Sequence, residues 1–300
     1  RLFTQALVVT VPDRVGAERL GRALHRVAVH HDLLRLGLDP SGALLIRDSD
    51  GHLVQCEDAM DPASGRDYFE HLQRRIDLVN GPLVVAAAGL GHGGRSFFIA
   101  AHHLVVDVVS WGIILEDLLA CLADHDVTLP PKTLPFPAWS ASLAEHARQG
   151  GFRGELAYWG EVAARAEAAG DLFPREPLTR GETEQEELVL DGVRASRLFD
   201  QARTLWNLSP ADALLAILTH ALGTEWNHTS VPVALEGHGR EPFGDGQDIV
   251  RTVGWFTSVY PQVVTVGPEI SDTLAAVREA GVRLPSKGFG FGPLRWLDPG

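Results

Sequence analysis

Hydrophobic positions along the first third of the chain alternate between two periods. Short apolar runs rich in Val, Leu and Ala have the length typical of strands, and they lie at residues 3–11, 33–38, 43–47, 83–88 and 96–103. Residues 14–30 instead carry apolar side chains at helical spacing, namely Val15, Leu20, Leu24 and Val27. The pattern therefore predicts strands that alternate with helices having one buried face.

Helical spacing dominates the middle of the chain. Residues 110–124 predict a helix whose acidic pair, Glu116 and Asp117, lies on the solvent side. Residues 128–137 are rich in proline and are expected to be extended, and residues 139–169 predict one or two surface helices.

The last part of the chain repeats the alternation. A strand is expected at 187–190, a helix at 193–205, and strands at 231–235 and 254–266. Ser209 is a good N-cap for an apolar helix through Leu222. Pro210 would occupy the first position of that helix, which proline favours.

The domain organisation follows from one polar stretch. Residues 171–186 have the composition of an exposed linker, which divides the chain into an N-terminal lobe of residues 1–170 and a C-terminal lobe of residues 187–300. The fold class expected from this alternation is α/β with two lobes.

Composition narrows the function classes. The 300 residues are 45% hydrophobic and 22% charged, which is typical of a globular protein with a sizeable core. A formal net charge of -13 argues against binding to nucleic acid or to a membrane surface. No run of eighteen apolar residues is free of charged or turn residues, and the first residues lack a signal-peptide pattern. Two cysteines, Cys56 and Cys121, are too few for a disulfide framework or a zinc site, so we expect a cytoplasmic protein without a metal.

Two glycine-rich stretches resemble nucleotide loops only superficially. GLGHGG, residues 89–94, has dinucleotide-loop spacing, but a strand rather than a helix is expected after it, so a hairpin turn is the better interpretation. In LPSKGFGFGPLRW, residues 284–296, Lys287 precedes glycines at every second position, which favours a close-packed or bulged backbone over a phosphate cradle. Other catalytic signatures, such as GxSxG, HExxH or CxxC, are missing from the sequence.

A histidine pair gives the first candidate for chemistry. In FIAAHHLVVDVVSW, residues 98–111, alternation along a strand points His102 and His103 in opposite directions, which disfavours their binding one metal. One histidine facing a cleft can act as a proton-transfer base, with Asp107 orienting the loop through a salt bridge. A buried, hydrogen-bonded histidine pair is the alternative.

A carboxylate gives the second candidate. Glu236 is expected where a strand gives way to Gly237 and Gly239, which permit a sharp turn and a close approach to a ligand. There it can serve as a second acid/base group, or it can pair with Arg240 or Arg251 in a surface turn. Trp255, Phe256 and Tyr260 in RTVGWFTSVYPQVV are expected mainly to pack.

Together, and in this order, these stretches resemble the epimerization domain of nonribosomal peptide synthetases. HHLVVDVVSWGIILEDL is similar to the family's histidine motif and VAVHHDLLRLGL to an earlier motif. EGHGRE and RTVGWFTSVYP resemble signatures that separate epimerization from condensation domains, and SKGFGFGPLRW resembles the last glycine-rich motif. The resemblance implies a two-lobed fold like that of chloramphenicol acetyltransferase, with the active site in the cleft between the lobes.

The resemblance also assigns roles. His103 matches the catalytic histidine, and Glu236 matches the carboxylate proposed to face it. Asp107 matches the aspartate that holds the histidine loop, Arg35 an arginine that pairs with it, and Arg251 a further arginine near the site. The supporting residues taken from the same motifs are His102, Ser110, Trp111, Gly237, His238, Arg240 and Tyr260.

The sequence departs from the family pattern at three points. Val108 stands where glycine usually follows the motif aspartate, and Ser286 replaces the asparagine that usually precedes Lys287. The family's first motif and its last motif, which carries an Asn-Tyr pair, fall outside the sequence, so we expect an incomplete C-terminal lobe.

The implied activity is cofactor-independent L-to-D inversion of an aminoacyl or peptidyl α-carbon, an isomerase reaction. The substrate is a thioester on the phosphopantetheine arm of a peptidyl carrier protein, which supplies the only prosthetic group. Neighbouring synthetase domains are the other expected partners. Main-chain groups at Asp107–Ser110 are expected to stabilise the enolate oxygen. The alternatives are a condensation domain that forms a peptide bond and a non-catalytic module that docks carrier proteins.

Overall fold

The computed structural model describes residues 3–11, 15–49, 53–58, 70–91, 94–170 and 187–299. The chain forms two compact units. Unit 1 comprises residues 1–145 and 238–257, and unit 2 comprises residues 146–237 and 258–300. The chain therefore passes between the units three times, and residues 238–257 belong with the N-terminal part of the sequence. Within the described residues, no helix combines the length and apolar character needed to cross a membrane.

Unit 1 is built on a four-stranded sheet in the order β1-β6-β5-β4. β1 (Thr4–Val11) pairs antiparallel with β6 (Gly94–His102), β6 pairs antiparallel with β5 (Val84–Gly91), and β5 pairs in parallel with β4 (Val54–Asp58). The pairing of β5 with β6 continues to Gly91 opposite Gly94, so the glycine-rich stretch joins a hairpin as the sequence predicted, although residues 92–93 lie outside the described residues.

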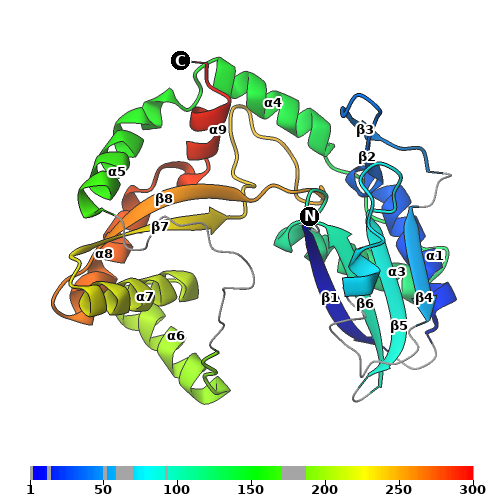
Figure 1. The fold of residues 1–300 in the computed structure, drawn as a ribbon, viewed down its shortest axis with the longest axis horizontal. Coiled ribbons are helices and arrows are strands. Elements are labelled where there is room, and N and C mark those ends of the chain that lie inside the picture. Colours follow the sequence, from blue (N-terminus) through cyan, green and yellow to red (C-terminus); the bar gives the residue numbers. More distant parts are fainter. Residues whose placement is uncertain are drawn as a thin grey trace. The chain divides into compact units, whose positions relative to one another are not determined.

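Alternation along the two central strands separates two layers of core. Ala86, Ile99 and Ala101 contribute to the cluster that includes helices α1 (Ala17–His30) and α3 (Val108–Ala123). Val85, Ala87, Phe98 and Ala100 belong instead to a second cluster with Leu72. Successive side chains of a strand point to opposite faces, so strands buried on both sides are continuously apolar. Figure 1 shows α1 and α3 beside the sheet.

Shorter elements complete unit 1. The 3-10 helix η1 (Asp32–Arg35) precedes a small ribbon of β2 (Leu36–Leu38) and β3 (Leu44–Ile46), and α4 (Phe136–Arg148) belongs to unit 1 as far as Glu145. The sequence predicted one strand over residues 33–38. The first residues form a helical turn instead, because Leu34 donates its backbone N–H to the His31 carbonyl and Arg35 bonds the Asp32 carboxylate.

Unit 2 is built on the antiparallel ribbon of β7 (Ser230–Gly237) and β8 (Ser258–Thr265). Adjacent side chains of β8 again serve opposite faces. Val264 packs in the cluster of α6 (Gly192–Trp206), α7 (Pro210–Trp226) and α8 (Ile270–Arg283), whereas Val263 packs against α5 (Leu156–Ala169). The 3-10 helices η3 (Arg153–Glu155) and η5 (Pro285–Gly288) and helix α9 (Phe291–Trp296) complete the unit.

Local signals in the sequence account for several helix ends. Ser209 accepts a hydrogen bond from the Asp212 backbone N–H and Pro210 opens α7, as predicted. Asn207 and Asn227 end α6 and α7 in the left-handed conformation, which asparagine tolerates better than most residues.

Three further sequence predictions differ from the structure. Residues 187–190 are extended but pair with no described strand, and Leu188 is 90% exposed. β8 begins at Ser258 rather than at residue 254, because the Gly254 backbone is bound by the Ser110 hydroxyl. Residues 146–170 were predicted in the N-terminal lobe but belong to unit 2, and residues 238–257 were predicted in the C-terminal lobe but belong to unit 1. The predicted linker, residues 171–186, lies outside the described residues.

Candidate functional site

The candidate catalytic histidine lies just beyond the end of a central strand of unit 1. β6 ends at His102, and His103 begins the turn that leads into α3. The His103 backbone N–H donates to the Phe3 carbonyl over 2.8 Å, and the Val105 N–H donates to the His102 carbonyl over 3.1 Å. These bonds fix the backbone of the turn, so His103 is held at the end of the central strand β6.

The hydrogen bonds around the His103 ring determine its tautomer. The Trp111 indole Nε1–H, which only donates, lies 3.0 Å from Gln5 Oε1, so the Gln5 amide NH₂ faces His103 Nε2 at 3.0 Å. His103 Nε2 therefore accepts. On the other side of the ring, Nδ1 donates to the Val106 carbonyl over 2.9 Å. Both ends of the ring indicate the same neutral tautomer, with the proton on Nδ1 and a lone pair on Nε2.

Two aromatic rings contact His103. Phe3 stacks on it with centroids 4.7 Å apart and planes 12° apart, and Trp255 approaches to 4.8 Å at a tilt of 43°. Phe3 and Trp255 also contact each other at 5.5 Å. The sequence treated Trp255 as a packing residue, and here it packs directly on the candidate base.

Asp107 anchors the turn between His103 and α3. Its carboxylate accepts from the Ser110 backbone N–H over 2.6 Å, which makes Asp107 the N-cap of α3. It also accepts from the Phe256 backbone N–H over 3.1 Å and from Arg240 Nη2 over 3.2 Å. The Asp107 and Arg240 side chains are only 3% and 9% exposed. The predicted salt bridge of Asp107 therefore exists, in a nearly dry environment.

The partner of Asp107 is Arg240, not Arg35 as the sequence predicted. Arg240 also donates to the Ile249 and Thr252 carbonyls, and its guanidinium lies 4.0 Å from the centre of the Phe256 ring. Burial lowers the pKa of Arg240, against the opposing effect of Asp107. The EGHGRE stretch is thus tied to the histidine loop through this arginine.

Arg35 instead bonds Asp32 over 2.6 Å and the Arg47 carbonyl over 2.6 Å. It lies three residues from its carboxylate partner on one turn of η1, so its ion pair is local.

Ser110 joins α3 to the RTVGWF stretch. Its hydroxyl donates to the Gly254 carbonyl over 2.8 Å and accepts from the Gly254 N–H over 3.0 Å, and Arg240 Nη2 lies 3.1 Å from the same oxygen. Ser110 is fully buried. A side chain on Gly254 would clash with Phe136, so the position requires glycine.

Arg251 binds the acidic pair that the sequence placed on the solvent side of α3. Glu116 is exposed, but Asp117 is 1% exposed, because neighbouring helical residues point about 100° apart. Arg251 donates to both carboxylates, and Asp117 also lies 2.8 Å from His31 Nε2. Burial lowers the pKa of His31 to about 4, although the hydrogen bond and charge of Asp117 act in the opposite direction.

This acidic cluster includes the one described group with the spacing of metal ligands. One ligand atom each of His30, His31 and Asp117 lies within 4.8 Å of the others. Both oxygens of Asp117 are already bound, one by His31 and one by the Arg251 guanidinium, whose positive charge opposes a metal ion. We therefore interpret the cluster as an ion-pair network.

Two further predicted residues have local roles. His102 Nδ1 accepts from the Leu104 backbone N–H over 3.1 Å, and burial lowers the pKa of His102. His238 Nδ1 accepts from the Arg240 backbone N–H over 3.0 Å, and its Nε2 lies 3.0 Å from Glu241. Both histidines fix a backbone turn next to a residue of the site.

The remaining predicted residues belong to unit 2. Glu236 is exposed near the end of β7, opposite Val259 of β8, and β7 ends at Gly237 as expected. Neither Arg240 nor Arg251 pairs with it among the described contacts, because those arginines bind Asp107 and the α3 carboxylates. His103 lies in unit 1, so the two predicted catalytic residues come from different units.

Tyr260 and the glycine-rich stretch pack together in unit 2. Gly288 has a φ of +84° and its backbone abuts the Tyr260 ring, and Gly290 abuts the Glu155 carboxylate. Ser286 donates to Glu155 over 2.6 Å. This confirms the close-packed backbone that the sequence predicted. Burial raises the pKa of Tyr260.

An apolar cavity of about 410 Å³ lies next to the His103 site in unit 1. Trp255 contacts His103 and also lines this cavity, and Leu104 lines it directly after His103 in the chain. The other lining residues are apolar except for Ser140, and they are Leu33, Leu36, Leu44, Leu45, Ile46, Phe136 and Pro137.

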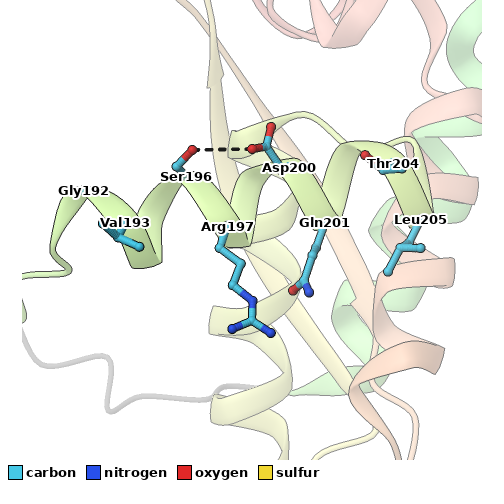
Figure 2. A pocket seen from close by; sticks show the side chains of 8 residues that line it. All are labelled: Gly192, Val193, Ser196, Arg197, Asp200, Gln201, Thr204 and Leu205. Atoms are coloured by element: carbon cyan, nitrogen blue, oxygen red, sulfur yellow. Dashed lines mark hydrogen bonds between the residues drawn. The ribbon is translucent and has the colours of Figure 1, made fainter.

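A wider hollow of about 760 Å³ lies along α6 in unit 2. Figure 2 shows that its lining residues all come from this helix and that Ser196 bonds Asp200, over 3.4 Å. It includes no residue that the sequence proposed for the site, and we assign it no function.

Gln5 and Phe3 contact the His103 ring but were not among the residues predicted for the site. Gln5 is the one amide side chain in β1, near the start of its apolar run, and β1 pairs with β6 so that Thr4 lies opposite His102. A polar residue at such a position in an apolar strand, near a histidine on the paired strand, is the signal that would have found it.

Unit 1 thus defines an α/β domain with a neutral histidine at the end of a central strand and an aspartate that caps the following helix. The family model of the condensation domain matches residues 1–297. The chain belongs to the condensation-domain family.

Known proteins of this family resemble the chain over almost its full length. It is 33% identical to bacitracin synthase 3 of Bacillus licheniformis, over 92% of this chain and 5% of that protein. It is 29% identical to tyrocidine synthase 2 of Brevibacillus parabrevis, over 98% of this chain and 9% of that protein. The chain therefore spans less than a tenth of the length of either synthase.

Solved structures of two kinds of domain share the fold. The epimerization domain from the third module of tyrocidine synthetase B has a TM-score of 0.88 and 27% identity, over 99% of this chain and 72% of that one. The first condensation domain of the CDA synthetase gives a TM-score of 0.71 at 18% identity, over 95% of this chain and 70% of that one. The expected α/β fold, like that of chloramphenicol acetyltransferase, is confirmed by these neighbours.

Proposed function

We propose that the chain inverts the α-carbon of an aminoacyl or peptidyl residue from L to D during nonribosomal peptide synthesis. The observation that carries the proposal is the network around Asp107. Its two long-range partners, Arg240 and the Phe256 N–H, come from EGHGRE and RTVGWFTSVYP, the stretches that resemble epimerization signatures. The likeness to an epimerization domain over 99% of the chain supports the same proposal.

The proposed substrate is a thioester on the phosphopantetheine arm of a peptidyl carrier protein. A thioester carbonyl acidifies the α-proton, so removal of that proton needs no pyridoxal cofactor. His103 Nε2 takes the proton, and the electron pair of the C–H bond moves into the carbonyl to give an enolate. Return of a proton to the opposite face gives the other epimer.

The second acid/base group in this proposal is Glu236. Its role rests on the resemblance of EGHGRE to the family motif. An exposed carboxylate at the end of a strand, followed by glycine, is free to meet a ligand. The order in which His103 and Glu236 act is set by the direction of the reaction.

The proposed partners are a carrier protein and the neighbouring domains of a synthetase. The apolar cavity beside His103 and Trp255 suits apolar groups of the thioester substrate, since charged side chains are not among its lining residues. We therefore expect substrates with apolar side chains to react faster than charged ones.

Peptide-bond formation is the second candidate, because the matched family model is that of the condensation domain. A condensation domain joins two carrier-bound substrates, whereas an epimerization domain needs only one. A docking module would bind the carrier protein without chemistry at the α-carbon.

One incubation separates these functions. The protein is mixed with a single aminoacyl carrier thioester in deuterated water, and the α-carbon label and the D to L ratio are measured. Label together with the D form supports epimerization. A product that forms only after a second, acceptor thioester is added supports condensation, and carrier binding with neither outcome supports docking.

A further inference from the structure

We propose that Gln5 is a catalytic residue that donates a hydrogen bond to the thioester oxygen as the enolate forms. The inference rests on the proposed function and adds a residue that the family resemblance did not supply. It uses only contacts within unit 1, where Gln5 lies on β1 beside the turn that carries His103.

The Gln5 amide is held in one orientation. Its Oε1 accepts from the Trp111 indole N–H over 3.0 Å, and Trp111 is 6% exposed within the core. Turning the amide over would place its NH₂ against an indole that has no acceptor, so the NH₂ group stays directed at His103. A donor fixed on a strand by a buried side chain is preorganised.

The distance places this donor where the developing charge will be. Gln5 Nε2 lies 3.0 Å from His103 Nε2. In a thioester, the carbonyl carbon is bonded directly to the α-carbon, so the carbonyl oxygen is a close neighbour of the α-proton. A substrate whose α-proton reaches His103 Nε2 can therefore bring its oxygen within reach of the Gln5 amide.

Arrival of the substrate frees the amide for this role. In the resting state, Gln5 donates to the lone pair of His103 Nε2. Nε2 has only this one lone pair, so the α-proton of the bound substrate displaces the Gln5 N–H from it, and Nε2 becomes a donor once it has taken that proton. At the same step the C–H electron pair moves onto the carbonyl oxygen, which becomes the stronger acceptor. The hydrogen bond lost at the histidine is thereby replaced at the enolate.

One of the main-chain donors that the sequence favoured is already used, because the Ser110 backbone N–H donates to Asp107 over 2.6 Å. The Gln5 NH₂ group, in contrast, faces the His103 nitrogen that takes the proton, which makes this side-chain donor the better candidate.

The test compares Gln5→Glu and Gln5→Ala with the wild-type protein. Gln5→Glu keeps an acceptor for Trp111 but replaces the donor by a carboxylate, which repels an enolate. We expect both variants to lower kcat for α-proton exchange about 10²–10³-fold, the usual loss for one oxyanion donor, with little change in KM. Gln55→Glu, at an exposed glutamine of β4 in the same sheet, is the matched control. Circular dichroism checks that the variants fold.

A second substrate distinguishes hydrogen bonding to the enolate from positioning of His103. A phenylglycyl thioester spreads the enolate charge into its ring and depends less on a donor at oxygen than an alanyl thioester. Gln5→Ala should therefore lose less activity on the phenylglycyl substrate.

Equal losses on both substrates, or exchange as fast as in Gln55→Glu, would overturn the role of Gln5. Absence of exchange in the wild-type protein would instead contradict the proposed function itself.

Discussion

Replacing Arg240 by leucine should destabilise unit 1 by about 3–5 kcal/mol, because it leaves the Asp107 carboxylate buried without its cation. The side chains are 3% and 9% exposed, so water does not replace the lost partner. Asp107 would keep its bonds from the Ser110 and Phe256 backbone N–H groups but lose the only charged group that bonds it among the described contacts.

The magnitude follows from comparison with an exposed pair of the same chemistry. Arg203 and Asp200 on α6 are 76% and 63% exposed and lie 3.1 Å apart. Such pairs contribute about 0–1 kcal/mol. Arg203→Leu is therefore the control, and the difference between the two substitutions isolates the effect of burial.

Hydrogen exchange followed by mass spectrometry measures the effect in each unit separately. Peptides covering α3 should lose protection in Arg240→Leu, whereas peptides covering β8 in unit 2 provide the internal reference. Adding Asp107→Asn to Arg240→Leu should recover about 0.5–3 kcal/mol relative to the sum of the single substitutions. If Arg240→Leu lowers the free energy of unfolding no more than Arg203→Leu does, the interpretation of Arg240 and Asp107 as a buried ion pair is refuted.

Three further predictions concern stability. Because burial lowers the pKa of His31 from 6.5 to about 4, the unfolded state binds more protons between these values, so unfolding free energy should fall by up to about 3 kcal/mol as the pH drops through this window. Urea titrations at several pH values should show a flatter profile in His31→Gln than in the wild type. Gly288→Ala should lower Tm, since a Cβ would clash with the Tyr260 ring and φ is +84°. An unchanged Tm would contradict the close packing of Gly288 against Tyr260. Ser209→Ala removes the cap of α7 and should cost about 1 kcal/mol in urea unfolding, and a cost near zero would contradict that role.

The order of elements was largely predictable from sequence because periodicity is a local property. The strands that became β1, β3, β5, β6 and β7 and the helices that became α1, α3, α6 and α7 lie close to their predicted ranges. The stretch at 187–190 failed because a strand needs a partner, and an apolar run alone does not show whether one exists.

Pairing between charged residues was less predictable. The family resemblance implied Arg35 as the partner of Asp107, but that arginine pairs with Asp32, three residues away. The actual partner, Arg240, is 133 residues distant along the chain. A contact of this kind depends on how the chain returns to unit 1 at residues 238–257, which neither composition nor spacing reveals.

The burial of Asp117 on α3 was predicted wrongly, because it too depends on contacts with residues distant in the sequence. Glu116 and Asp117 are adjacent in sequence, yet only Asp117 points into the core, where His31 and Arg251 bind it. Compensation by groups from other elements decides whether a carboxylate is buried. The His103 tautomer, likewise, depends on Gln5 and Trp111 from two different elements.

The most direct test of the account is α-proton exchange by His103→Ala, measured as deuterium incorporation into one aminoacyl carrier thioester. His125→Ala, at an exposed histidine of unit 1, is the control, and Glu236→Gln is assayed beside it. We expect that His103→Ala loses about 10²–10⁴-fold in exchange rate, that Glu236→Gln is also impaired, and that His125→Ala matches the wild type. Exchange by His103→Ala at the wild-type rate would contradict the assignment of His103 as the acid/base group.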